Sequence, residues 1–368
     1  MPMMHRTGRW VILLLLIAGL ISTPCLAFSG EEEINHLYAS LPDDRTDALR
    51  AAQDENGLDL NRGLHQLVEN AYQAVGGILK EGLKTSASLL AVCLLCSLSS
   101  LLIGEQNVIG NNAVRCASVG TVLLIGVQRV QSSLSLVSEL LEELRVFANA
   151  LLPAMTAAGV AAGSGSSAFA KQSAAVLGAD LMIGLFAKCL LPLTYVTLGI
   201  RAAGILSQNG FLNRFSAFIR STTGLVIRTL LALYLGYLSV CGLVGSAADT
   251  LAKKAAKTAV FAGIPIVGGT LTEAAESVFA GGAVIRSMLG VFGLIGVLSC
   301  ALLPLLSTGL SYLSLRAAAA MAQCVPDHPG REAVDAVADA VSMAFAMCAG
   351  AVAMLLISVI LCMKSAGG

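Results

Sequence analysis

The chain has 368 residues, of which 56% are apolar and only 12% are charged. Soluble domains carry about a quarter charged residues, so this composition excludes an ordinary soluble enzyme and predicts an all-α polytopic membrane protein. A transmembrane barrel would instead show alternating segments of about ten residues. The formal net charge of zero gives no indication of a nucleic-acid partner.

Residues 1–27 have the three parts of a secretory signal peptide. Arg6 and Arg9 form a positive start, an apolar core follows at 11–21, and small residues precede the boundary after Ala27. The core is too short to span a bilayer comfortably. We expect cleavage after Ala27 and an extracytoplasmic amino terminus, with an uncleaved anchor as the alternative.

Residues 28–84 form the one sizeable polar segment and are predicted to be extracytoplasmic and helical. From Leu58 onward the apolar side chains follow helical spacing, which predicts an amphipathic helix leading into the membrane. The apolar face of this helix has three possible uses: docking of a partner, packing on the protein's own membrane helices, or lying on the bilayer.

Residues 85–363 are predicted to be a multi-span domain with six to nine crossings, seven being the single best number. The apolar segments lie at about 85–103, 114–131, 146–163, 173–207, 224–246, 284–315 and 338–363. Two of them exceed the length of one crossing and contain Pro192 and Pro304, respectively. Each of the two is expected to be either a kinked helix or a tight helical pair, because proline disrupts a helix interior.

An internal repeat is a further hypothesis. Four prolines form two equally spaced pairs, Pro153 with Pro192 and Pro265 with Pro304. The shift that superimposes the pairs also carries the apolar segment 224–246 onto the last apolar segment. Many transport folds consist of such repeats, so residues 140–247 and 252–363 are predicted to be related halves. Chance similarity in a Leu/Ala/Gly-rich chain is the alternative.

Ionisable residues inside or at the edges of the apolar segments are candidate functional groups, because charges at membrane depth usually face a protein interior or a water-filled cavity. They are Asp180, Lys188, Arg201, Arg228, Arg286 and Arg316. Asp180 and Lys188 are eight residues apart and therefore share one helix face. They are expected either to neutralise each other through neighbouring residues or to line a pathway, whereas the basic side chains alone could instead reach toward lipid headgroups.

The segment 249–276 is the most distinctive in the chain. A basic helix, a Pro/Gly break and an acidic helix start follow one another there, and the candidate functional residues are Asp249, Lys253, Lys254, Lys257, Pro265, Gly268, Glu273 and Glu276. Acidic side chains suit the first turns of a helix. The glycines do not form a phosphate-binding loop, because no Gly-Lys-Ser/Thr follows them.

This Lys-rich helix, Pro/Gly turn and Glu-Ala-Ala-Glu helix start resemble the stage III sporulation protein AE family of endospore-forming bacteria. The similarity also covers the signal sequence, the polar segment and the multi-span remainder. It implies a membrane subunit of the apparatus that joins the mother cell to the forespore, in the mother-cell (outer forespore) membrane. The implied partners are membrane lipid, sister products of one operon (a secretion-type ATPase and ring-forming membrane proteins) and a forespore protein across the intermembrane space.

No enzyme motif competes with this interpretation, and we expect neither a catalytic activity nor a cofactor or metal. The chain lacks an HExxH zinc motif and a Gly-x-Ser-x-Gly elbow. Cys93 and Cys96 have CxxC spacing, but buried packing residues are the simpler interpretation. A permease-like or channel subunit is therefore expected, with an independent secondary transporter or a membrane scaffold as alternatives.

Amino-terminal sequencing of membrane-purified protein tests the signal peptide. Cleavage after Ala27 predicts that the sequence begins at Phe28. An intact Met1 in all molecules would contradict both the cleavage and the extracytoplasmic amino terminus.

Overall fold

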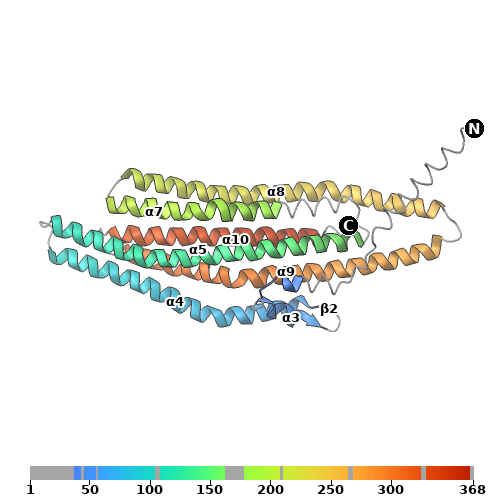
Figure 1. Cartoon of the computed structure of the whole chain (residues 1–368), viewed down its shortest axis with the longest axis horizontal. Helices are drawn as coiled ribbons and strands as arrows, with labels where there is room; N and C mark the ends of the chain where they lie inside the picture. The colour runs from blue at the N-terminus through green and yellow to red at the C-terminus, as the bar shows by residue number, and fades with distance from the viewer. Residues whose placement is uncertain are drawn as a thin grey trace, which may run out of the picture.

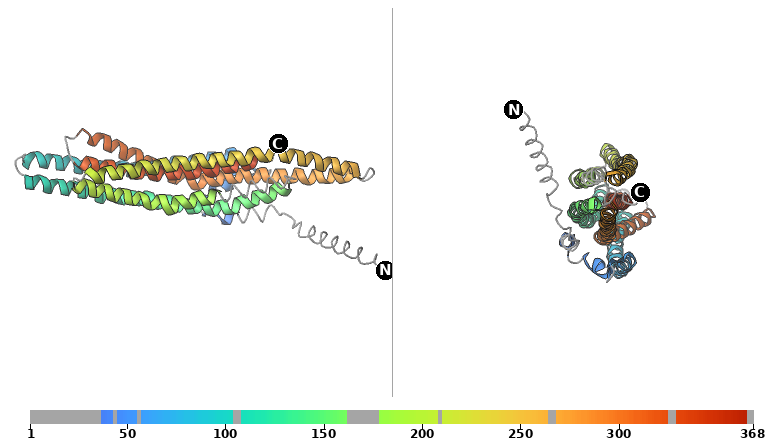
Figure 2. Two further views of the ribbon diagram at one scale, coloured as in Figure 1. Left: turned by 90° about the horizontal axis from the view of Figure 1, so that it is seen from above. Right: turned by 90° about the vertical axis from the view of Figure 1, so that its right-hand side faces the viewer.

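The computed structural model shows long helices that lie side by side along one axis in an elongated, narrow bundle (Figures 1 and 2). It describes residues 37–42, 45–54, 57–103, 108–161, 178–207, 210–263, 268–324 and 329–364. The elements are α3 (Asp47–Ala52), β1 (Gln53–Asp54), β2 (Gly57–Leu58), α4 (Leu60–Ile103), α5 (Val108–Ala161), the π-helical turn η2 (Phe186–Leu190), α7 (Leu191–Ser207), α8 (Gly210–Gly263), α9 (Gly268–Ala322) and α10 (Pro329–Lys364).

The main helices are unusually long because helix-breaking residues gather at their ends. α8 ends at Gly263, two residues before Pro265, and α10 begins at Pro329, where the first helical turn tolerates proline. α5 and α8 each contain 54 residues and α9 contains 55, so each is roughly 80 Å long. The hydrocarbon core of a bilayer is about 30 Å thick. These helices therefore extend well beyond the part that a membrane can cover.

The described residues contain six helical segments that are long and apolar enough to cross a membrane: Leu60–Ser100, Asn112–Gly159, Gly178–Ser207, Gly210–Leu238, Ser287–Ala322 and Gly330–Ile360. The predicted all-α polytopic fold is thus confirmed. The described strands, β1 and β2, have two residues each and pair antiparallel. Two of the seven predicted apolar segments, 114–131 and 146–163, lie on the single helix α5. The number of crossings stays a prediction.

α9 and α10 form the centre of the bundle. α9 packs against α4, α5 and α10, while α10 packs against α5, α7 and α8. α7 and α8 form a pair on the side of α10 that lies away from α4 (Figure 1). In the α9 and α10 segments, 61% of the most apolar 18-residue stretch is buried inside the bundle, against only 17% in the α8 segment. α8 is therefore an outer helix of this bundle.

The described part of the predicted amino-terminal segment 28–84 packs on the bundle. The ring of Tyr38 meets Phe292 of α9 edge-on, with the centroids 5.1 Å apart. Ser299 Oγ, also on α9, donates a hydrogen bond of 2.5 Å to the carbonyl oxygen of Arg45. Burial raises the pKa of the Tyr38 hydroxyl. Of the three uses considered for this segment, the structure shows packing on the protein's own helices, and α4 runs on without a break into the first apolar segment.

The two long proline-containing segments differ in local structure. Pro192 follows the π-helical turn η2, whose wider spacing accommodates a proline that cannot donate a hydrogen bond. Pro304 lies inside α9, which continues as an α-helix. Neither segment is a tight helical pair in the described residues.

The structure also fixes the direction that an internal repeat would have. The long helices alternate in direction along the chain (Figure 1). The proposed shift moves the end of α5 onto the end of α8, α7 onto α9, and the first part of α8 onto α10. Each of these moves skips one antiparallel helix, so the halves 140–247 and 252–363 would run parallel. The repeat itself stays a prediction.

Close packing of α5 on α10 depends on Gly126, and substitution to alanine tests this. A methyl group at Gly126 would overlap Val337 of α10, whereas a methyl group at Gly120 would meet nothing within 4 Å. Alanine favours a helix interior over glycine by about 1 kcal/mol, but overpacking costs about 1–3 kcal/mol. Gly126→Ala should lower the melting temperature in detergent, and the control Gly120→Ala should leave it unchanged or raise it. Equal effects of the two substitutions would contradict this packing.

Candidate functional site

A buried carboxylate lies where α7, α8, α9 and α10 approach one another. The side chain of Asp339 on α10 is only 8% exposed. Arg201 of α7 donates a hydrogen bond to Oδ2 of Asp339, and Nη2 of Arg220 on α8 lies 2.7 Å from Oδ1. Nη1 of Arg316 on α9 lies 3.8 Å from the same oxygen. One carboxylate therefore attracts guanidinium groups from three other helices.

The electrostatic balance of this cluster is positive. Asp335, one turn before Asp339, accepts a hydrogen bond of 3.4 Å from Nη1 of Arg316. Two carboxylates thus face three guanidinium groups, which stay protonated in proteins. Charge-assisted hydrogen bonds of this kind are stronger than neutral ones. Removing a buried carboxylate would leave several like charges without compensation.

A second charged network lies at nearly the same level on the other side of α9. Arg129 of α5, whose side chain is 8% exposed, has Nη1 2.7 Å from Oε1 of Glu81 on α4. Its Nη2 donates a 2.5 Å hydrogen bond to Oγ of Ser311 on α9. Ser311 and Arg316 are five residues apart, which is about 7.5 Å along a helix. A layer of charged and polar groups therefore crosses all six long helical segments.

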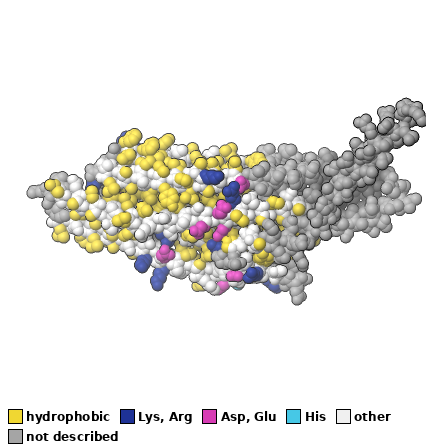
Figure 3. Space-filling view, viewed as in Figure 1, with side chains coloured by type: hydrophobic (Ala, Val, Ile, Leu, Met, Phe, Trp, Pro, Cys, Tyr) yellow, Lys and Arg dark blue, Asp and Glu magenta, His cyan; other side chains and the backbone are white. Residues whose placement is uncertain are grey.

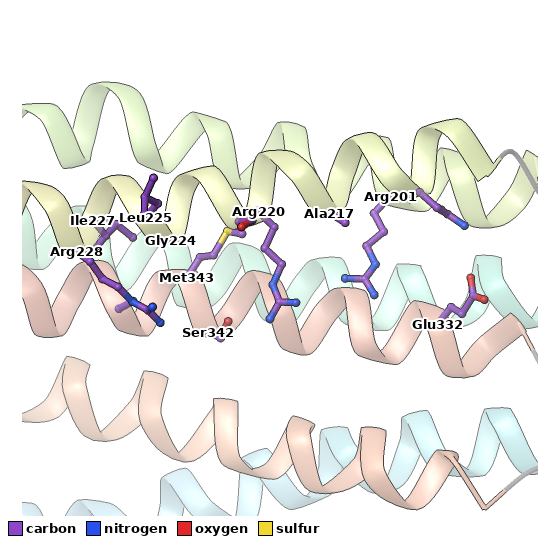
Figure 4. A pocket seen from close by; sticks show the side chains of 13 residues that line it. Arg201, Ala217, Arg220, Gly224, Leu225, Ile227, Arg228, Glu332, Ser342 and Met343 are labelled. Carbon is purple, nitrogen blue, oxygen red and sulfur yellow. The ribbon is translucent and has the colours of Figure 1, made fainter.

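A groove opens beside the buried aspartate, between α8 and α10. Its volume is about 900 Å³, within the range of small-molecule pockets. Arg220 and Arg228 extend from α8 toward α10, and Arg201 enters from α7 (Figure 4). The groove is lined by Arg201, Asn213, Ala217, Arg220, Ser221, Gly224, Leu225, Ile227, Arg228, Glu332, Ser342, Met343 and Ala346.

The sequence-predicted pair Asp180 and Lys188 does not pair directly. Asp180 is bound by Arg145 of α5, with Nε 2.5 Å from Oδ1 and Nη2 3.4 Å from Oδ2. Lys188 lies in the π-helical turn η2 and is exposed. The carboxylate of Asp180 is therefore compensated from α5, and Lys188 points away from the bundle core.

The predicted motif 249–276 lies on the ends of α8 and α9 that project from the bundle (Figure 1). Asp249 and the lysines Lys253, Lys254 and Lys257 are on α8, which runs on without a break from its apolar part. Gly268 is the first residue of α9, and Glu273 and Glu276 follow in its first turns. Pro265 lies outside the described residues, as do the side chains of the other motif residues. α8 ends at Gly263 and α9 begins at Gly268, and the residues between them, where the break is predicted, lie outside the described residues.

The described cysteines differ in burial. Cys93, Cys300 and Cys348 are buried and Cys96 is half-buried beside Cys93 on α4, whereas Cys116, Cys189 and Cys324 are exposed. In the described part of the chain, no group of three or more His, Cys, Asp or Glu residues is placed to hold a metal ion.

Sequence reasoning found part of the arginine cluster and missed its centre. Arg201, Arg228 and Arg316 were recognised as charges in apolar segments, and the structure brings all three near the groove or Asp339. Asp339 stands at the edge of the last apolar segment, 338–363, one helical turn after Asp335. Two acidic residues on one face of such a segment are a detectable signal, since they need basic partners. Arg129 lies near the end of the predicted apolar segment 114–131 and is also visible as a charge there, but its partner Glu81 lies in the polar segment 28–84, so the sequence does not indicate their pairing.

The sequence of the chain matches a known protein family. A model of the family described as stage III sporulation protein AE matches residues 56–366, nearly the whole chain. The chain belongs to this family. Family membership gives the protein a role in sporulation, and the six apolar helices make it a membrane protein. No curated protein and no solved structure matches the chain.

Asparagine at position 339 tests the central role of the buried carboxylate. Asp339→Asn keeps the shape of the side chain but leaves Arg201 and Arg220 without their counter-charge. We expect the free energy of unfolding to fall by about 2 kcal/mol. This is less than for a fully buried ion pair, because Arg220 is 44% exposed. Reversible unfolding in SDS titrations of the purified protein measures it.

The matched control for this measurement is Asp335→Asn on the same helix. Asp335 makes one contact of 3.4 Å with Arg316, whose side chain is 53% exposed. Such a pair contributes about 0–1 kcal/mol. If the two asparagine variants lose the same stability, Asp339 has no special place in the bundle.

Proposed function

We propose that the protein is a permease-like or channel subunit of the transport apparatus between mother cell and forespore, and that it supports forespore development. It would lie in the mother-cell membrane that surrounds the forespore. The family's role in sporulation supports the context. The charged layer within helices long enough to span a membrane supports the activity.

The observation that carries this proposal is the buried Asp339 cluster with its adjoining groove. Ionisable side chains inside membrane-spanning segments are costly and commonly mark the paths of ions or solutes. A protein that served only as an anchor would be expected to bury apolar side chains at this level. Here Asp339, Arg201 and Arg220 occupy the meeting point of α7, α8 and α10, and the groove opens beside them.

The direction of the helices supports an orientation in the membrane. If the signal peptide leaves the amino terminus outside the cytoplasm, the end of the bundle that holds the carboxyl ends of α4, α7 and α9 is cytoplasmic (Figure 1). Arg214 and Arg220 lie near that end on α8, in agreement with the positive-inside rule. The segment 249–276 then projects from the opposite end, toward the space between the two membranes. A forespore partner would meet the protein there.

A secondary transporter acting alone is the alternative function that a specific observation favours. Arg145 and Asp180 form a two-contact ion pair between two helical segments that are each able to span the membrane. Charges in membrane-spanning segments commonly pair with one another and mark ion or substrate pathways. A scaffold that only recruits partners is the remaining possibility from the sequence.

Copurification from sporulating cells separates these functions. Native purification of a tagged chain should recover a secretion-type ATPase and ring-forming membrane proteins, identified by mass spectrometry. If the chain comes alone and moves a small solute in liposomes, it is an independent transporter. If partners come with it but neither current nor solute passage is found in the purified assembly, it is a scaffold.

A charge reversal at Glu273 tests the projecting segment. Glu273 lies in the second turn of α9, beyond the break that follows the lysines Lys253, Lys254 and Lys257 on α8. If the lysines and Glu273 attract each other, Glu273→Lys should block sporulation after engulfment while the protein still reaches the membrane, and reversal of one lysine should partly restore it. The control is Glu139→Lys, an exposed position on α5. Normal spore yield from a variant that combines Glu273→Lys with Glu276→Lys would contradict this role of the glutamates. It would indicate instead that the lysines bind only lipid headgroups.

A further inference from the structure

We infer that the groove between α8 and α10 is a binding site for a phosphate ester, held chiefly by Arg220 and Arg228. This inference goes beyond the proposed function, because it assigns a ligand class and requires no transport. Both guanidinium groups extend from α8 toward the groove (Figure 4).

The charges that line the groove are unbalanced. Its lining holds the three guanidinium groups of Arg201, Arg220 and Arg228, and one carboxylate, that of Glu332. Asp339 lies behind the lining and is shared by Arg201 and Arg220. Among the described residues, Arg228 makes no hydrogen bond or ion pair. An anion in the groove would supply the missing negative charge.

The backbone between the two arginines leaves room for a ligand. Arg220 and Arg228 are eight residues apart on α8, so they share one face and stand about 12 Å apart along the axis. Gly224 lies midway between them, and a side chain there would meet nothing within 4 Å. The hydroxyl group of Ser221 also lines this stretch. An open stretch of helix surface is thus bordered by two fork-shaped donors and a hydroxyl group.

Phosphate fits these donors better than other common anions. A guanidinium fork binds two oxygens at once, and a phosphate presents enough oxygens to accept from two forks and a hydroxyl group. A carboxylate has only two oxygens, which lie in one plane, whereas a phosphate ester presents at least three, which separate donors can reach from different directions. The volume of about 900 Å³ far exceeds one inorganic phosphate ion, so the remainder of the groove suits the organic part of an ester.

Two sources can supply such an ester. A lipid headgroup is one source, because basic pockets between membrane helices bind anionic headgroups. Arg220 and Arg228 lie 10 and 18 residues from the start of α8 at Gly210, about 15 and 27 Å along the helix axis, so a headgroup reaches them where the membrane surface crosses the bundle at the level of the arginines. A soluble phosphate ester would enter from the aqueous side instead. The experiment therefore has one arm for each source.

The test uses the full-length protein purified in detergent, with Arg228→Gln as the variant. Arg228 makes no hydrogen bond or ion pair with the described residues, so the fold should persist, and an unchanged melting temperature verifies this. The matched control is Arg214→Gln, an exposed arginine on the same helix outside the groove. In the lipid arm, native mass spectrometry compares retention of phosphatidylglycerol and phosphatidylcholine from equimolar mixed micelles. In the soluble arm, calorimetry measures binding of glycerol 3-phosphate.

The inference predicts binding in at least one arm, weakened about tenfold or more by Arg228→Gln and unchanged by Arg214→Gln. Preferential retention of phosphatidylglycerol identifies a headgroup site, and binding of glycerol 3-phosphate identifies a soluble ligand. Absence of binding in both arms overturns the inference, as does equal weakening by the two substitutions, which would indicate general surface charge. Because neither arm measures transport or copurification, this result and that of the proposed function can fail separately.

Discussion

The carboxylate of Asp339 is the constraint on which the arrangement of α7, α8, α9 and α10 depends. Each of the other three helices brings an arginine to the same level of the bundle. Three guanidinium groups would repel one another in a medium of low dielectric constant unless a negative charge lay between them. The buried aspartate therefore sets the register of these helices as well as their proximity. The groove exists beside it because the arginines lean toward α10 and leave the surface around Gly224 open.

Large apolar side chains are exposed on both sides of this level. On α4 they include Tyr72 before the Glu81–Arg129 pair and Leu98 after it. On α8 they include Phe211 before Arg220 and Leu233 after it. Charges and apolar side chains are distributed unevenly over the visible face (Figure 3). A membrane perpendicular to the bundle axis would cover only one of the two apolar surfaces. If the bundle is tilted in the membrane, as membrane helices commonly are, the bilayer covers part of both surfaces.

The sequence predicted the class of fold well because that depends on composition and on the length of apolar segments. It predicted individual helices less well, since nothing between 131 and 146 stops a helix and two predicted segments merged into α5. It identified Arg201 and Arg316 because a charge in an apolar segment is visible without a structure. Helical spacing placed Asp180 on one face with Lys188, but it did not indicate the ion pair with Arg145, which comes from another helix. Pairing between helices depends on register, which a single sequence does not contain.

A double-mutant cycle between Asp339 and Arg220 tests most directly whether this ion pair holds the bundle in register. Unfolding free energies in SDS would be measured for Asp339→Asn, Arg220→Gln, the double variant and the unaltered protein. The account predicts a coupling energy of about 1 kcal/mol or more, with the double variant more stable than the sum of the single losses implies. A coupling energy near zero, with strictly additive losses, would contradict it.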